Sequence, residues 1–324
     1  MNNITNENIK VYNKKQLLFK FVFLLILIFI DIKLKKVEKK FFYERNRKNP
    51  KLAYYYIDLD PYKESINLEE GGKLEIFNNN CTNETSKINT KSSGPINKTD
   101  IVFLVIPGGS YRKLGEVESI PIAKKFFYMG YSSALLSYSV APSSYPTFYN
   151  QGLESIKILS LKFKKIIIIG FSAGGHLAGM LGTSSKDKLY NTIGMILCYP
   201  VISFENKVHK FSRANFFGKK YKDNAENRKI FSVNNRVTNN TIPTFIWTIK
   251  NDKTVPYENT LAMIESLKKY GIRHEYKIYP KGVHGMALAD EFDIRYGNPD
   301  YKNDNVAQWI NLAVKFFEEI LKES

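Results

Sequence analysis

From residue 101 onward, short apolar runs alternate with longer segments in which apolar residues recur at helical spacing. The apolar runs show no polar alternation, which is typical of strands buried on both faces of a parallel sheet. We predict strands at 101–106, 132–140, 166–170, 193–202, 244–250 and 274–280, and helices at about 118–129, 148–163, 173–182, 257–270 and 303–322. This repeated strand–helix order predicts an α/β fold with a mostly parallel sheet and helices on both faces.

Three stretches depart from this alternation. Residues 41–100 are charged and rich in Asn, Ser and Thr, and we interpret them as a polar linker with an edge strand at 73–77. A long irregular stretch at about 204–240 interrupts the predicted domain 101–324, and we expect it to form a small cap over one end of the sheet. The third stretch, residues 1–40, contains a long apolar run of a different kind.

Within that stretch, residues 17–30 are apolar apart from Lys20, and lysines lie on both sides. Counted from Val11 to Leu34, with Lys20 reaching toward the surface, the segment is long enough to cross a bilayer. No small-residue cleavage site follows, which favours an uncleaved signal anchor over a cleaved signal peptide. We therefore expect membrane attachment through residues 17–34, or secretion if the segment is cleaved. Because both flanks are basic, the sequence does not set the orientation.

Composition and charge exclude other classes. The formal net charge is +17, but the excess is spread out: residues 1–60 carry 13 Lys/Arg against 6 Asp/Glu, and the remaining residues 35 against 25. We interpret this as a solvated lysine-rich surface, and no zinc-finger spacing or aromatic-interleaved basic motif indicates a nucleic-acid partner. Two cysteines, Cys81 and Cys198, are too few for a disulfide framework or a four-ligand zinc site.

The apolar run at 166–170 leads directly into the sequence Gly-Phe-Ser-Ala-Gly, which has Ser172 at its centre. A buried strand has to turn sharply into a helix here, and the flanking glycines allow close backbone packing. The turn places Ser172 on a tip above the carboxyl edge of the sheet, where the following helix N-terminus favours developing negative charge. The pattern predicts a nucleophile elbow, and it lacks the endings of phosphate-binding and dinucleotide-binding loops.

A serine hydroxyl needs a general base, and the chain contains four histidines. His284 follows a predicted strand in the Gly-flanked loop KGVHG, from which an imidazole can swing over the sheet edge. His176 lies in the helix after the elbow, His209 in the irregular stretch and His274 at the start of a strand. His284 is therefore the predicted base.

The base in turn needs an acid that orients it, and Asp252 is the predicted one. It comes just after the predicted strand 244–250 and precedes His284 in the chain. Asp290 and Asp293 come after the histidine and fit less well. The resulting order, Ser then Asp then His, is the one that an α/β-hydrolase sheet imposes.

Acyl transfer also needs hydrogen-bond donors for the oxyanion. The sequence places Gly108, Gly109 and Ser110 directly after the early strand 101–106. Without side chains, the backbone N–H groups of such a loop can approach a substrate oxygen closely. The N–H of Ala173, just after the nucleophile, is predicted to supply a further donor.

Six motifs, in order along roughly residues 70–320, resemble bacterial acetylesterases, the acetyl-xylan-esterase-like members of the α/β-hydrolase superfamily. They are PGGSY (107–111), LSYSVAPSSYP (136–146), GFSAGGHLAG (170–179), CYPVIS (198–203), PTFIWTIKNDKTVPYENTLAMIESLKKYGI (243–272) and YPKGVHGMALA (279–289). The resemblance implies an α/β-hydrolase fold without metal or organic cofactor. It also implies a catalytic triad of Ser172, Asp252 and His284 and oxyanion donors at Gly109 and Ala173. Ser110 replaces the family's third loop glycine but still offers its N–H.

These features favour a serine carboxylesterase that hydrolyses short acyl esters, with acetyl groups on a small molecule or carbohydrate as the expected substrate. Two alternatives stay open at this point. A peptidase or lipase on the same scaffold uses the same triad, and a membrane-attached binding protein retains the fold without catalysis. The sequence does not reveal the acyl chain length, the alcohol portion or the oligomeric state.

Overall fold

The computed structural model describes residues 57–79, 97–290 and 299–323. The predicted signal anchor in residues 1–40, including the apolar segment 17–34, lies outside these residues. Among the described residues, the structure contains no helix that is both long and apolar enough to span a membrane.

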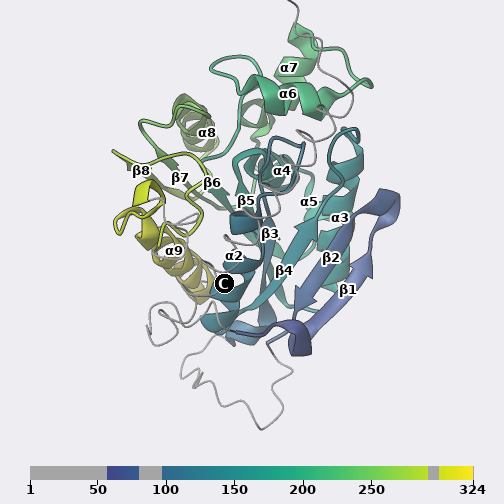
Figure 1. The fold of residues 1–324 in the computed structure, drawn as a ribbon, viewed down its shortest axis with the longest axis vertical. Coiled ribbons are helices and arrows are strands. Elements are labelled where there is room, and N and C mark those ends of the chain that lie inside the picture. Colours follow the sequence, from purple (N-terminus) through teal and green to yellow (C-terminus); the bar gives the residue numbers. More distant parts are fainter. Residues whose placement is uncertain (1–56, 80–96, 291–298, 324) are drawn as a thin grey trace, which may run out of the picture. The chain divides into compact units, whose positions relative to one another are not determined.

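Within the described residues, eight strands form one sheet in the order β1-β2-β4-β3-β5-β6-β7-β8 (Figure 1). The strands are β1 (Lys63–Asn67), β2 (Lys73–Phe77), β3 (Ile101–Ile106), β4 (Ser132–Ser137), β5 (Lys165–Phe171), β6 (Thr192–Cys198), β7 (Thr244–Ile249) and β8 (His274–Tyr279). β2 is antiparallel to both neighbours, and all other neighbouring pairs are parallel. The prediction of a mostly parallel sheet is confirmed.

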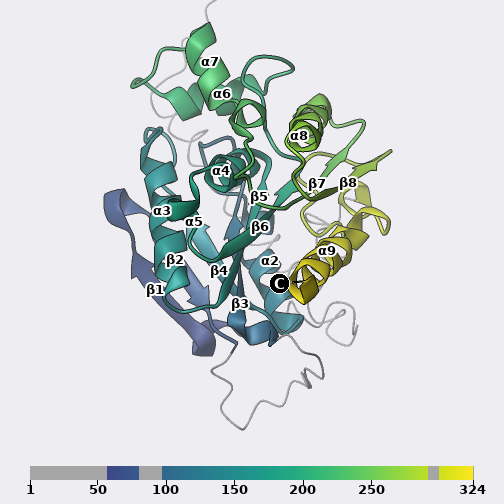
Figure 2. The ribbon, with the colours of Figure 1, turned by 180° about the vertical axis from the view of Figure 1, so that it is seen from behind.

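Helices cover both faces of this sheet, as the pattern predicted (Figure 1 and Figure 2). They are α2 (Ile120–Tyr128), α3 (Thr147–Ser160), α4 (Ser172–Gly182), α5 (Lys186–Leu189), α6 (Lys210–Phe217), α7 (Ala225–Phe231), α8 (Glu258–Lys269) and α9 (Trp309–Glu323). Side chains of α3, α4 and α8 belong to one hydrophobic core, and those of α2 and α9 belong to the other.

The two cores explain why the apolar runs are unbroken. In β3, Val102 and Leu104 enter the core formed with α3, α4 and α8, whereas Phe103 and Val105 enter the opposite core. Because successive side chains of a strand point to opposite faces, a strand covered on both sides needs an apolar residue at every position. All six residues of β3 are accordingly buried.

The edge of the sheet differs from the prediction. β2 coincides with the strand predicted at 73–77, but β1 pairs with its outer side and is itself the edge strand. The β1 sequence KESIN contains a single apolar residue, Ile66, and most of its side chains are exposed. An edge strand of this kind is held by its backbone hydrogen bonds, so the hydrophobic pattern did not indicate it.

Some predicted elements run longer than the observed ones. β4 ends at Ser137 and β6 at Cys198, each a few residues before its predicted end. After β6, Tyr199 has a φ of 37° and Pro200 has no N–H, so the ladder stops there. α9 begins at Trp309, because 3-10 turns occupy the residues before it.

The stretch 204–240 is more regular than its sequence pattern indicated. It contains α6 and α7, which lie next to each other at one end of the described residues in both views (Figure 1 and Figure 2). The Asn224 side chain caps α7 by accepting a hydrogen bond from the Asn227 N–H at 2.8 Å. The Asn215 side chain of α6 donates to the Ser110 carbonyl at 2.9 Å. The stretch therefore contacts the loop that follows β3.

Candidate active site

Ser172 lies at the junction where β5 ends and α4 begins, and its φ is 50°. The flanking glycines permit this turn. A Cβ on Gly170 would lie 2.3 Å from the Gly174 carbonyl oxygen, and one on Gly174 would lie 2.3 Å from the Ile106 carbonyl oxygen. Such contacts are too short for any side chain, so the strand, helix and neighbouring β3 can meet only at glycine. The strained, left-handed conformation of Ser172 is the one expected of a nucleophile elbow.

His284 lies in the loop after β8 and contacts both of the other predicted triad residues. The Ser172 hydroxyl lies 2.9 Å from His284 Nε2, and His284 Nδ1 lies 2.6 Å from Asp252 Oδ2. Because the carboxylate accepts, Nδ1 carries the proton and Nε2 accepts from the serine hydroxyl. The structure therefore brings together three side chains that are 32 to 112 positions apart in the sequence.

Asp252 is held rigidly after the end of β7. Its Oδ1 accepts hydrogen bonds from the backbone N–H groups of Thr254 at 2.8 Å and Val255 at 3.0 Å, which leaves Oδ2 for His284. The Asp252 side chain is fully buried, whereas that of His284 is 16% exposed. This arrangement fixes the orientation of the imidazole and places a buried carboxylate beside its Nδ1.

The loop after β3 packs directly on the elbow. A Cβ on Gly108 would lie 2.9 Å from the Ser172 Cβ. Gly109 has a φ of +116°, and a Cβ there would lie 2.1 Å from the Lys113 carbonyl oxygen, so only glycine fits. Within the described part of the chain, no acceptor meets the N–H of Gly109 or Ala173. Neither N–H group is therefore taken up by a protein acceptor in this part of the chain.

Two further predicted donors of this loop have other geometry. The Gly108 N–H donates to the Glu118 carboxylate at 2.8 Å, so in this structure it is directed at a protein acceptor. Ser110 has a φ of 60°, and its carbonyl accepts from Asn215. Sequence reasoning missed Glu118, because an acidic residue before a helix is most simply explained as a surface residue.

The other histidines serve local structure. His176 is fully buried; its Nδ1 accepts from the Tyr111 hydroxyl at 2.8 Å, and its Nε2 donates to the Phe231 carbonyl at 2.8 Å. Burial lowers the pKa of His176 to about 3, so the ring is neutral. His209 accepts at Nδ1 from the Ser212 N–H and caps α6. His274 donates to the Ile272 carbonyl at 2.7 Å.

His209 also lies within electrostatic reach of the triad. Its burial and the neighbouring His284 both lower the pKa of His209, whereas Asp252 opposes that shift. The stretch 204–240 therefore brings an imidazole toward the candidate site. Of the aspartates considered as alternatives, Asp293 lies outside the described residues.

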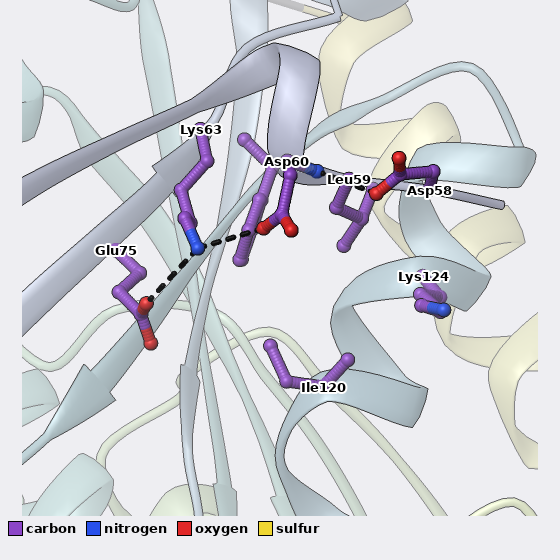
Figure 3. A pocket seen from close by; sticks show the side chains of 8 residues that line it. Asp58, Leu59, Asp60, Lys63, Glu75, Ile120 and Lys124 are labelled. Atoms are coloured by element: carbon purple, nitrogen blue, oxygen red, sulfur yellow. Dashed lines mark hydrogen bonds and ion pairs between the residues drawn. The ribbon is translucent and has the colours of Figure 1, made fainter.

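A pocket of about 360 Å³ lies apart from these groups (Figure 3). Inside it, Lys63 lies 2.7 Å from the Asp60 carboxylate and 4.0 Å from that of Glu75, so charges of both signs face one another. Its lining contains none of the predicted site residues: Asp58, Leu59, Asp60, Lys63, Glu75, Phe77, Ile120 and Lys124. Within the described residues, no group of three or more His, Cys, Asp or Glu side chains is arranged to hold a metal ion.

Comparison with known proteins assigns the chain to a family. The sequence profile of the prolyl oligopeptidase family matches residues 158–323, just over half of the chain and the part that contains the triad residues. The chain belongs to the prolyl oligopeptidase family. This membership and the structural comparisons confirm the predicted α/β-hydrolase relationship. One 24% identical neighbour, an α/β-hydrolase enzyme from a deep-sea metagenome, shares the fold with a TM-score of 0.62.

Two curated relatives are similar to part of this chain. Endo-1,4-beta-xylanase B of Butyrivibrio fibrisolvens is 31% identical over 222 residues, which are 61% of this chain and 34% of the relative. The acetylxylan esterase of Xylanibacter ruminicola is 34% identical over 143 residues, which are 43% of this chain and 29% of the relative. The chain thus spans about a third of the length of these relatives.

Solved structures extend the similarity over most of the chain. An acetyl ester-xyloside bifunctional hydrolase from Caldicellulosiruptor lactoaceticus is 27% identical, with a TM-score of 0.63 over 78% of this chain and 89% of its own. A carboxylesterase from Lactobacillus plantarum has a TM-score of 0.65 over 79% of this chain and 96% of its own. At 23% identity, the latter shows the fold alone.

Proposed function

We propose that the chain is a serine carboxylesterase that hydrolyses short-chain acyl esters, with acetyl as the preferred acyl group. The observation that carries the proposal is the continuous hydrogen-bonded series from the Ser172 hydroxyl through His284 to Asp252. A buried carboxylate, an imidazole whose unprotonated nitrogen accepts from the serine hydroxyl, and a serine on a strained turn together form an activated nucleophile.

The reaction follows from this geometry. Ser172 Oγ attacks the ester carbonyl while His284 Nε2 takes its proton, and the N–H groups of Gly109 and Ala173 receive the oxyanion. The tetrahedral intermediate collapses, the C–O bond to the alcohol breaks, and His284 returns the proton to the leaving oxygen. Water then attacks the acyl-enzyme through the same base, which releases the carboxylic acid and restores the Ser172 hydroxyl.

The substrate class rests on the relatives. One is named for acetylxylan esterase activity, another for xylanase activity, and a structural neighbour for cleavage of acetyl esters and xylosides. We propose an acetylated carbohydrate or a small acetyl ester as the substrate. A panel of acetylated xylo-oligosaccharides and unrelated acetyl esters tests this choice.

The decisive test of the activity compares wild type with Ser172→Ala on p-nitrophenyl acetate. We expect kcat per folded protein to fall by about 10⁴-fold or more, because the acyl-enzyme cannot form. A fluorophosphonate should label Ser172 in the wild type and leave the variant unlabelled. Equal hydrolysis by the two proteins contradicts the proposal, and failure to label folded wild type favours a non-catalytic binding protein.

Membership in the prolyl oligopeptidase family supports a second candidate, a serine peptidase on the same triad. The triad geometry serves esters and amides alike. N-acetylated peptide anilides, assayed beside the acetyl ester, distinguish the two activities. An esterase has a much higher kcat/KM for the ester than for the anilide, whereas a peptidase cleaves the anilide at a rate comparable to that of the ester.

We also propose that residues 17–34 attach the protein to a membrane, or direct its secretion if they are cleaved. The support is the apolar run with lysines on both sides. Membrane fractionation with protease protection tests attachment and orientation. Recovery of the intact chain in the soluble fraction contradicts both forms of this proposal.

A further inference from the structure

Glu118 is a buried acid with an unusual setting. It ends the 3-10 turn η5 (Glu116–Glu118) directly before α2, and only 5% of its surface is exposed. Within the described residues, no ion pair joins it to a Lys, Arg or His side chain. Removing a carboxylate from water costs several kcal/mol unless hydrogen bonds or opposite charges offset it. The contacts of its two oxygens therefore show what holds it there.

One oxygen fixes the loop that carries the proposed oxyanion donor. Glu118 Oε2 accepts the Gly108 N–H at 2.8 Å, and the Gly108 carbonyl accepts the Gly115 N–H at 3.0 Å. That carbonyl belongs to the same planar peptide as the Gly109 N–H. Because the two point in opposite directions across a trans peptide, the Gly115 N–H that holds this carbonyl also sets the direction of the Gly109 N–H. A Cβ on Gly115 would lie 2.4 Å from Oε2, so the carboxylate fits tightly between both glycines.

The other oxygen reaches the loop that carries the general base. Glu118 Oε1 accepts from the Tyr199 hydroxyl at 2.8 Å, and that hydroxyl accepts from the Ala287 N–H at 3.1 Å. Tyr199 is fully buried, and its ring meets the His284 ring edge-on at 5.0 Å. Burial and the Glu118 charge raise the pKa of Tyr199, which keeps the hydroxyl protonated as a donor.

We propose that Glu118 is a positioning residue that couples the oxyanion loop to the His284 loop. This inference rests on the proposed esterase function and adds a residue to it. The role requires two acceptor oxygens, because Gly108 and Tyr199 both donate. An amide at position 118 has one acceptor and one donor group, so either the Gly108 N–H or the Tyr199 hydroxyl would face an N–H instead of an oxygen.

The experiment compares Glu118→Gln with a matched control, Glu318→Gln. Glu318 also accepts from a tyrosine hydroxyl, that of Tyr131 at 2.8 Å, but it lies on α9. Active sites are titrated with a fluorophosphonate so that kcat refers to folded enzyme. For p-nitrophenyl acetate we expect Glu118→Gln to lower kcat about 10- to 100-fold and to leave KM within about twofold of wild type. This fall in kcat is smaller than the one that follows removal of a whole oxyanion donor.

A transition-state analogue supplies a readout that a merely structural role does not move. The serine oxygen adds to the carbonyl of a trifluoromethyl ketone and forms a tetrahedral oxyanion. The affinity of Glu118→Gln for this ketone should therefore fall by the same factor as kcat. Tyr199→Phe keeps the hydrogen bond between Gly108 and Glu118, and we expect a smaller loss of about 3- to 10-fold in kcat. If Glu118→Gln does not fold, Tyr199→Phe alone decides.

Three results overturn the inference: unchanged kcat per active site in Glu118→Gln, an equal loss in Glu318→Gln, or unchanged kcat in Tyr199→Phe. Failure of the esterase proposal is recognised separately, because wild type itself then does not hydrolyse the ester. In that case the fluorophosphonate labelling rate of Ser172 still reports on Glu118, since phosphonylation also develops an oxyanion.

Discussion

At the scale of single residues, Asp252 divides its two oxygens between backbone and base. Oδ1 accepts from the N–H groups of Thr254 and Val255, and Oδ2 faces His284. In Asp252→Asn the backbone donors claim the carbonyl oxygen, so the amide NH₂ points at Nδ1. The ring then carries its proton on Nε2 and cannot accept from Ser172. We expect kcat for p-nitrophenyl acetate to fall about 10³- to 10⁴-fold with little change in melting temperature.

The matched control for that substitution is Asp100→Asn. Asp100 forms an ion pair with Lys164 at 2.7 Å; the two residues precede β3 and β5, at the opposite end of these strands from Ser172. The control should retain kcat within about twofold, since an exposed ion pair contributes about 1 kcal/mol or less to stability. A loss of less than tenfold in Asp252→Asn shows that the amide does not adopt the predicted direction.

His176 adds a pH dependence to folding. Burial lowers its pKa from 6.5 to about 3, while in the unfolded chain the ring binds a proton below about pH 6.5. The contribution of neutral His176 to stability is therefore complete above pH 6.5 and is lost as the pH falls from there toward 3. The free energy of unfolding should decrease by up to about 1.4 kcal/mol per pH unit in this window.

Urea unfolding at about pH 7.5 and about pH 5 tests this dependence. His176→Gln should be less stable than wild type at the higher pH, because the contacts to Tyr111 and Phe231 change. Between the two pH values it should lose roughly 2 kcal/mol less than wild type. An identical loss in both proteins shows that His176 is not the titrating group.

At the scale of elements, Asn259 joins α8 to two loops of the site. Its Oδ1 accepts from the N–H groups of Ile202 and Ser203, and its NH₂ donates to the carbonyls of Lys207 and Pro256. Asn259→Ala leaves buried backbone groups unpaired. We expect a loss of about 2–4 kcal/mol in the free energy of unfolding, measured with urea.

Asn259→Asp separates the two halves of this contact. A carboxylate still accepts from the two N–H groups but places an oxygen opposite two carbonyl oxygens. Its stability should therefore fall as well, and it should recover toward wild type as the pH is lowered enough to protonate the new acid. If Asn259→Ala costs less than about 1 kcal/mol, water replaces the side chain and the loops do not depend on it.

The interior elements were predictable because their physics is local. A strand buried on both faces must be apolar throughout, so β3, β5 and β7 stand out in the sequence. The elbow is a five-residue motif, and the order of Ser172, Asp252 and His284 follows from the topology of such a sheet. These features place the candidate triad without any knowledge of long-range contacts.

The features that were missed depend on partners far along the chain. β1 is held by backbone pairing with β2 and carries one apolar side chain, so no periodicity marks it. Glu118 contacts Tyr199 across 81 positions, and its burial follows from the packed loops around it. For the same reason, the sequence did not indicate that the Gly108 N–H donates to Glu118.

At the scale of the whole molecule, part of the spread-out positive charge lies in the stretch that contacts the candidate site. Residues 204–240 carry nine Lys/Arg and three Asp/Glu, so a net +6 of the total +17 lies in about a ninth of the chain. The same stretch contacts the loop after β3 through Asn215 and Ser110 and brings His209 toward His284. Its exposed lysines are Lys207, Lys210, Lys219, Lys220, Lys222 and Lys229.

This distribution predicts that an anionic ester is attracted to the site. We expect kcat/KM for 4-acetoxybenzoate to fall about 3- to 10-fold between about 20 and about 500 mM salt, because ions screen the field of the lysines. The neutral p-nitrophenyl acetate should change by less than about 1.5-fold, since it carries no charge for the field to act on.

A triple variant assigns the effect to the stretch 204–240. Lys219→Gln, Lys220→Gln and Lys222→Gln together should lower the low-salt rate for the anionic ester and weaken its salt dependence, while the neutral ester is hydrolysed as before. Lys186→Gln with Lys188→Gln on α5 is the control, because these lysines are also exposed but lie outside the stretch. Equal salt dependence for the two esters in wild type excludes steering, and an equal effect of both variants assigns it to the net charge of the molecule instead.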